Sequence, residues 1–158
     1  RPFSVWNGAA SVIQRNSGNQ IIGFTGGDYN LDGGGGAVGG GFYDRPNAPA
    51  NLNTNWTNAD FLNGLFTASQ FPAPIAGTDG NLGRNTFRGP GFTTLDVSVA
   101  RKFRFTETKC LILKAEAFNA FNNVNLYLPN ADLSLPTFGK STQAFEPRNM
   151  QISAKFMF

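Results

Sequence analysis

The sequence has no histidine and a single cysteine, and these two shortages exclude several kinds of chemistry. Without histidine, Ser-His and Cys-His catalysis is excluded, and so are most zinc sites. The lone Cys110 cannot form a disulfide within the chain, so cysteine usage does not indicate a compartment. The carboxylates form no convergent catalytic motif either. We therefore do not expect an enzyme.

Charge and long apolar runs are also scarce. Charged residues make up 15% of the 158 residues, whereas a soluble domain usually has about a quarter. The 13 basic and 10 acidic residues give a net charge of +3 without a basic run, so we expect no nucleic-acid partner. No apolar run approaches the roughly 18 residues of a membrane helix, but a barrel strand needs only about 9–11 alternating residues.

What the chain has in quantity is glycine (19 residues) and phenylalanine (16 residues), as is typical of strands and turns. The clearest pattern is "FTTLDVSVARKFRF", residues 92–105, where apolar and polar side chains alternate with period two. A short polar turn, 106–109, precedes a second alternating stretch, 110–121. Its composition also suits a helix, but the short turn favours an antiparallel hairpin. The last stretch, "RNMQISAKFMF", residues 148–158, alternates as well.

These patterns predict an all-β fold of about four antiparallel strands of the outer-membrane-barrel type. Long loops rich in Gly, Asn and Pro connect them, with one short helix near 58–71. We expect a single β-rich segment, 1–158, made of a strand at 1–12, a long loop region at 13–91 and three C-terminal strands within 92–158. The apolar side chains predicted to share one face are Leu95, Val97, Val99, Leu111, Leu113, Ile152 and Phe156.

Alternation alone would equally suit a soluble sandwich, so the connections must decide. The 106–109 turn is very short, whereas both neighbouring connections are long. Outer-membrane barrels have short periplasmic turns and long extracellular loops. We therefore place 106–109 in the periplasm, and 16–91 and 122–147 outside the cell.

The chain resembles the end of TonB-dependent outer-membrane receptors, particularly the large type with an N-terminal carboxypeptidase-regulatory-like domain. The resemblance rests on "GRNTFRGPGFTTLDVSVARKF", "KAEAFNAFNNVN" and "FGKSTQAFEPRNMQISAKFMF", and it covers 83–158. A weaker likeness over 1–47 rests on "RPFSVWNG" and "DYNLDGG…YDRPN". It implies the bacterial outer membrane, and it makes the terminal aromatic strand, with Phe156 and Phe158, the signal for barrel assembly.

A candidate calcium loop lies in "DYNLDGGGG", where Asp28, Asn30 and Asp32 are followed by glycine. Alternate carboxylate and amide oxygens can converge on one ion, which makes calcium the one cofactor that the sequence suggests. The bidentate Glu expected at the twelfth position is replaced by Gly39, so Asp44 would have to contribute instead. A solvated turn without an ion is the alternative interpretation.

The chain has no initiator Met and no signal peptide, so we expect Arg1 to be a cut end, of a processed product, of a fragment, or of the visible part of something longer. About four strands cannot close a barrel, since about eight are needed. Such a piece would expose unpaired strand edges, which copies of itself could cover by strand addition. The alternative function is therefore a self-assembling structural protein, an extracellular homo-oligomer or polymer with edge strands paired between subunits.

Overall fold

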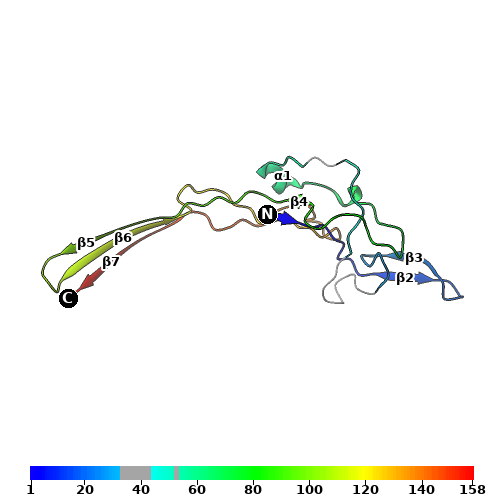
Figure 1. Ribbon diagram of the computed structural model, residues 1–158, viewed down its shortest axis with the longest axis horizontal. Helices are drawn as coiled ribbons and strands as arrows, with labels where there is room; N and C mark the ends of the chain where they lie inside the picture. Colours follow the sequence, from blue (N-terminus) through cyan, green and yellow to red (C-terminus); the bar gives the residue numbers. More distant parts are fainter. Residues whose placement is uncertain (33–43, 52–53) are drawn as a thin grey trace. The chain divides into compact units, whose positions relative to one another are not determined.

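The computed structural model describes residues 1–32, 44–51 and 54–158, whose contacts form two compact units (Figure 1). The first unit comprises the described residues of 1–90 and 127–143, and the second comprises 91–126 and 144–158. Across these ranges there are seven strands, one short α-helix and one 3-10 turn, and every pair of strands is antiparallel. The all-β prediction is confirmed. None of the described helices has the length and apolar content to cross a membrane.

The strand expected over residues 1–12 is much shorter in the structure. β1 (Pro2–Phe3) pairs with β4 (Phe87–Arg88), and the chain then leaves the ladder. The Trp6 N–H donates to the carbonyl of Ala131 at 3.1 Å, a partner that is distant in sequence. The apolar alternation here reflects single side chains buried in a core rather than one continuous strand.

A hairpin lies inside the region expected to be a long loop. β2 (Val12–Arg15) pairs with β3 (Ile21–Thr25). Between them Asn19 has a φ of 63°, a left-handed conformation that asparagine tolerates, and its N–H donates to the carbonyl of Asn16 at 2.9 Å. The two strands are too short for a period-two pattern to be distinguished from chance alternation. For this reason the sequence did not predict them.

The predicted short helix is α1 (Asn58–Asn63), followed by the 3-10 turn η1 (Ala68–Gln70). A capping box begins it: the Thr57 hydroxyl accepts from the Asp60 N–H, and the Thr57 N–H donates to the Asp60 carboxylate at 2.7 Å. Hydrogen bonds from the backbone and then the side chain of Thr57 lower the pKa of Asp60. The helix is short because Gly64 follows with a φ of 115°, outside the helical range.

Aromatic rings form the core of the first unit. The centre of the cluster is Phe66, whose ring centroid lies 5.1 Å from those of Phe71 and Phe138 and 5.4 Å from that of Phe87. The Phe66–Phe71 and Phe71–Phe138 pairs are T-shaped, an arrangement that aligns ring edges with ring faces. Phe3, Val5, Leu82 and Ala131 complete the buried cluster. This core holds the irregular segments of the unit together.

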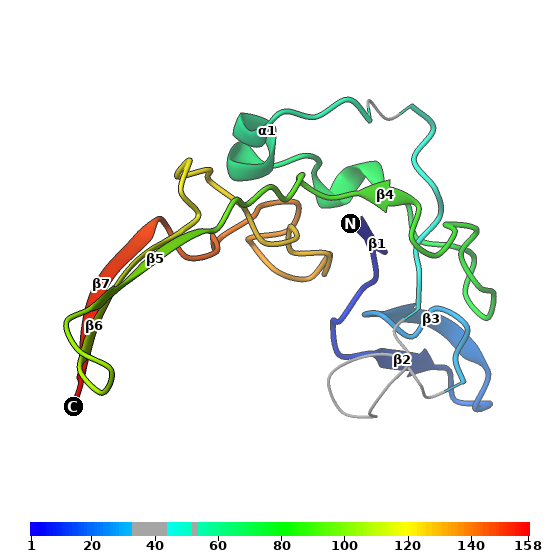
Figure 2. The ribbon, with the colours of Figure 1, turned by 60° about the vertical axis from the view of Figure 1, so that its left-hand side comes forward.

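The second unit contains one sheet, in the order β5–β6–β7 (Figures 1 and 2). Its strands are β5 (Val97–Arg104), β6 (Cys110–Phe118) and β7 (Asn149–Met157). The register runs without a bulge, with Leu113 opposite Arg101 on one side and Ala154 on the other. Residues 110–118 are therefore strand and not helix. We call the end at 105–109 the turn end of the sheet.

Asparagine side chains terminate the sheet at its opposite end, which we call the asparagine end. The Asn125 amide holds Thr93 on both sides: its Oδ1 accepts from the Thr93 N–H at 2.8 Å, and its Nδ2 donates to the Thr93 carbonyl at 2.9 Å. The Asn119 N–H donates to Asp96 Oδ1 at 2.9 Å, and Asn119 itself has a φ of 50°. Side-chain bonds replace the strand ladder here, so β5 begins at Val97 rather than near residue 92.

Candidate functional site

One face of the β5–β7 sheet consists almost entirely of apolar side chains. The cross-strand register places them in rows, such as Val99, Ala115 and Ile152. Paired residues point to the same side of a sheet, so the rows form one surface. We call this surface the apolar face, and its members are Val97, Val99, Arg101, Phe103, Leu111, Leu113, Ala115, Ala117, Met150, Ile152, Ala154 and Phe156.

No other part of the described second unit covers this face. Ile152 is 85% exposed, Met150 is 70% exposed and Val99 is 65% exposed. Six of the seven side chains predicted to share a face belong to it, and the seventh, Leu95, precedes β5. A soluble protein rarely leaves so large a contiguous apolar surface open, so this one marks contact with a partner or a membrane.

The opposite face of the same sheet is largely polar. Lys114 Nζ lies 2.7 Å from Glu116 Oε1, and the Gln151 amide donates to Glu116 Oε2 at 2.8 Å. These three residues come from two neighbouring strands and form a small network on the surface of the sheet. Ser98, Lys102, Arg104, Ser153 and Lys155 share this polar face. A sheet with one apolar and one polar face suits a wall between an apolar medium and water.

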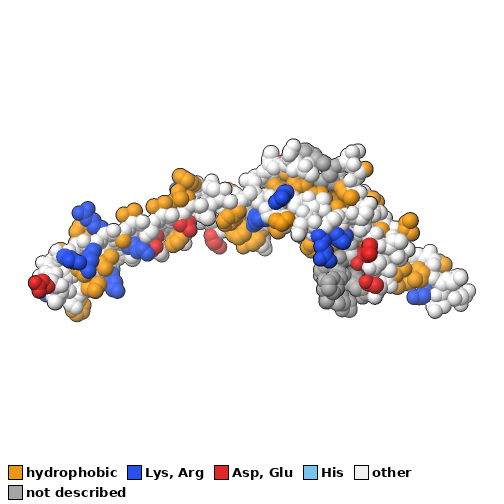
Figure 3. All heavy atoms as spheres, viewed as in Figure 1, with side chains coloured by type: hydrophobic (Ala, Val, Ile, Leu, Met, Phe, Trp, Pro, Cys, Tyr) orange, Lys and Arg blue, Asp and Glu red, His pale blue; other side chains and the backbone are white. Residues whose placement is uncertain are grey.

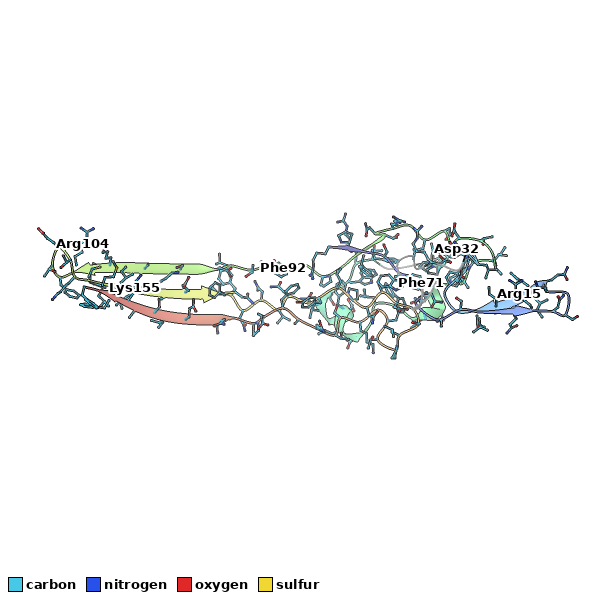
Figure 4. The ribbon with its side chains drawn as sticks, turned by 90° about the horizontal axis from the view of Figure 1, so that it is seen from below. Arg15, Asp32, Phe71, Phe92, Arg104 and Lys155 are labelled. Atoms are coloured by element: carbon cyan, nitrogen blue, oxygen red, sulfur yellow. The ribbon has the colours of Figure 1, made fainter. Side chains whose placement is uncertain are left out.

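Aromatic and basic side chains gather at the turn end. The rings of Phe105 and Phe156 lie 6.5 Å apart, and Phe156 stacks on Phe158 at 6.2 Å. Phe158 is 92% exposed. Figure 4 labels Arg104 and Lys155 at this end, and Figure 3 shows Lys and Arg side chains gathered over it. The two predicted assembly-signal residues, Phe156 and Phe158, therefore lie together, but their role stays a prediction.

Both edges of the sheet are open in the part of the chain that the structure describes. No described strand pairs with the outer side of β5 or with that of β7. Each edge presents backbone N–H and C=O groups that another strand could pair with. Further strands could therefore extend the sheet at either edge.

The candidate calcium residues lie in the first unit, where the structure brings them close together. The Asp32 N–H donates to Asp28 Oδ1, and the Asn30 N–H donates to Asp44 Oδ2, both at 3.1 Å. The Asn30 amide donates to Asp32 Oδ2 at 3.2 Å and to Asp79 Oδ1 at 3.0 Å. The sequence did not suggest Asp79, because it lies 47 residues beyond Asp32.

The arrangement of these groups does not by itself form a calcium site. Their carboxylate oxygens accept N–H groups of the same loop, and within 1–32, 44–51 and 54–158 no group of three or more carboxylate, thiolate or imidazole side chains could hold a metal ion. Gly39, which occupies the twelfth position of the loop, lies outside the described residues. Calcium binding therefore stays a prediction.

A tyrosine borders this loop and is also buried. Burial raises the pKa of Tyr29, although the hydrogen bond from Asn7, at 2.9 Å, opposes that rise and the negative charge of Asp44 adds to it. The hydroxyl therefore stays protonated at neutral pH, where it is a hydrogen-bonding group rather than a base.

A cleft of about 380 Å³ at the asparagine end was not predicted. The rings of Phe92 and Phe145, T-shaped with centroids 5.0 Å apart, line it together with Asp96, Asn119 and Asn125. The amides of both asparagines already bond within the loop, so they shape the wall of the cleft. The dense asparagine run "NAFNNVN" was the one signal in the sequence that marked this structured end.

Comparison with protein families supplies the context for this two-faced sheet. A family model described as "Outer membrane beta barrel domain" matches residues 6–151, which is most of the chain. Curated proteins and solved structures give no match. The match covers most of both compact units and includes β5 and β6 in full, and it ends within β7. The chain belongs to the outer membrane beta barrel domain family, and it is a barrel-type protein of the outer membrane.

Proposed function

We propose that the chain is the C-terminal barrel portion of a TonB-dependent outer-membrane receptor, of the type with an N-terminal carboxypeptidase-regulatory-like domain. One observation carries this proposal: three antiparallel strands expose a continuous apolar face opposite a polar face. The resemblance of residues 83–158 to the ends of such receptors supports a receptor over other barrels. The apolar face meets lipid, and the polar face meets the lumen.

The dimensions of the sheet support this orientation. The nine residues of β6 extend roughly 27–30 Å along the strand at about 3.4 Å each. Tilted by about 35–45°, they cover roughly 20–25 Å of height, close to the apolar band of about 25 Å on outer-membrane barrels. The aromatic rings at the turn end then lie at the interface, with the turn on the periplasmic side.

The role that follows is that of a wall segment and not of a complete transporter. A barrel closes with about eight strands or more, and the sheet described here has three. Its open edges pair with neighbouring strands of the same barrel. Recognition and uptake of a substrate belong to the whole receptor, and the last strand, with Phe156 and Phe158, carries the assembly signal.

The test is the native polypeptide itself. Outer membranes of the source cells are fractionated, and the protein carrying this sequence is purified and sequenced by mass spectrometry. A receptor predicts a chain several-fold heavier than 17.0 kDa, with a plug domain and a TonB box upstream. A heavy barrel protein that lacks both would contradict the receptor proposal and keep the barrel.

The open edges of β5 and β7 favour a second candidate function, a homopolymer of this chain outside the cell. Strand addition from one copy to the next would pair these edges, and a head-to-tail contact that does not close gives a filament. This candidate predicts 17.0 kDa subunits in extracellular filaments visible by electron microscopy. A monodisperse monomer with native strand content in detergent-free buffer would exclude it.

A further inference from the structure

The apolar face of the β5–β7 sheet carries one charged side chain among its described members, Arg101. In the register it lies opposite Leu113, with Ala154 beyond, so its row is otherwise apolar. The face holds no carboxylate, and Arg101 forms no ion pair with any residue that the structure describes. If this face meets lipid, as the proposed function has it, an arginine in such a row needs an anionic partner from elsewhere.

The guanidinium group of Arg101 is already oriented by a neighbouring ring. Its Cζ lies over the ring of Phe103, 5.3 Å from the centroid, as in a cation–π contact. Phe103 is two residues nearer the turn end on the same face. The long side chain therefore leans along the strand toward the turn end, and the edge of its N–H groups remains open to a ligand.

The depth of Arg101 brings its charge within reach of the membrane surface. It lies three residues before Arg104, the last residue of β5, which is roughly 10 Å along the strand. At a barrel tilt of about 35–45° this is roughly 7–8 Å in height, a distance that an arginine side chain spans by snorkelling. Phe156, one of the aromatic rings of the turn end, lies in the row of Phe103, one row nearer the turn than Arg101.

We propose that Arg101, held by Phe103, binds the phosphate group of a membrane phospholipid in the leaflet at the turn end. The proposal rests on the proposed function, in which the apolar face meets lipid. A planar guanidinium donates two parallel hydrogen bonds to phosphate oxygens, and the acyl chains then lie on the apolar rows beyond it. At this end Glu107 and Lys109 lie in the turn, and Lys102, Arg104 and Lys155 belong to the polar face, so Arg101 is the one basic group that the described apolar face offers to the phosphate.

The experiment measures lipid retention by native mass spectrometry of the complete native protein released from detergent. Two probes with the same acyl chains are titrated, dioleoyl phosphatidylglycerol and dioleoyl glycerol, which lacks the phosphate. Arg101→Gln is expected to weaken phosphatidylglycerol binding about five-fold, because one basic group near a membrane surface contributes a factor of about this size to binding. Binding of the neutral lipid is expected to stay unchanged. Lys102→Gln is the matched control, because it removes the same charge from the adjacent residue on the polar face.

Each outcome decides the proposal. Equal affinity of wild type and Arg101→Gln for phosphatidylglycerol overturns it, and so does an equal loss in both variants, which would indicate a general charge effect. If Arg101→Gln fails to fold, the wild type still decides, since equal retention of the two lipids overturns the proposal. Fluorescence quenching by brominated lipids, compared between the Val97→Trp and Ser98→Trp variants, tests the lipid-facing assignment separately. Quenching at Val97 with no effect of Arg101→Gln would reject this inference and keep the proposed function.

Discussion

A lysine in the middle of the apolar face should destabilise the folded barrel strongly. Ile152 lies in the row of Val99 and Ala115, one residue from Lys114 at the centre of β6, so its row is near mid-membrane depth. Ile152 is 85% exposed, so in the orientation proposed for the sheet the substituted ammonium group would face lipid directly. A Lys on the lipid face at the midplane costs about 2–4 kcal/mol. Ile152→Lys should therefore lower the folding equilibrium constant roughly 30- to 900-fold.

The matched control is Gln151→Lys, which adds the same charge one residue away on the polar face. Gln151 lies beside Glu116, so the introduced ammonium group would meet a carboxylate in a hydrated site. An exposed ion pair of this kind changes stability by about 1 kcal/mol or less. The two variants therefore differ in which side of the sheet receives the charge.

The assay is urea unfolding of the complete protein in bilayers of defined thickness. Unfolding is monitored by tryptophan fluorescence and by the heat-dependent change in electrophoretic mobility of the folded barrel. The reasoning predicts a large loss for Ile152→Lys and a small change for Gln151→Lys. If the two variants unfold within about 0.5 kcal/mol of each other, the apolar face does not meet lipid, and the orientation proposed for the sheet is wrong.

Four further groups of side chains give predictions that can be measured separately. In the aromatic core, Phe66→Ala should destabilise the first unit by about 3–5 kcal/mol, measured by amide hydrogen exchange, whereas Phe121→Ala, at a ring that is 71% exposed, should have little effect. Phe158→Ala should slow barrel assembly in pulse-labelled cells, and an unchanged rate would remove its role as a signal. Calcium should raise the melting temperature of the native chain but not of the Asp28→Ala variant, and an excess of chelator that shifts nothing would end the calcium prediction. Because the pKa of Asp60 is lowered, the capping box stabilises α1 above the ordinary pKa of the carboxyl group and is lost as the pH falls through the lowered value, which a carboxyl NMR titration would follow.

The sequence predicted the three C-terminal strands well because period-two alternation is a direct physical consequence of a two-faced sheet. The register then placed Val99, Leu113 and Ile152 on one surface, as the alternation required. The strand boundaries were less accurate. Hydrogen bonds to the side chains of Asp96 and Asn125, which no periodicity shows, end the strands early.

The first unit was predictable only in part. Its aromatic core draws Phe3, Phe66 and Phe138 from segments far apart in sequence, and no local pattern records such contacts. The pairing of β1 with β4 joins residues more than 80 positions apart for the same reason. The calcium motif predicted the proximity of Asp28, Asn30 and Asp32, but it could not reveal that their oxygens accept hydrogen bonds from the loop itself.

The asparagine end isolates the sheet from changes in the length of the connection that leaves it. Asn119 Oδ1 accepts from the Asn123 N–H at 3.0 Å, its Nδ2 donates to the Asn123 carbonyl at 3.0 Å, and the Arg148 N–H donates to Asn122 Oδ1 at 3.1 Å. These bonds fix the exit of β6 and the entry of β7 before the connection diverges. Insertions or deletions between residues 127 and 143 should therefore leave the alignment of β6 with β7 unchanged. The same sheet could then carry many different connections between β6 and β7. A single scaffold can in this way present different loop surfaces.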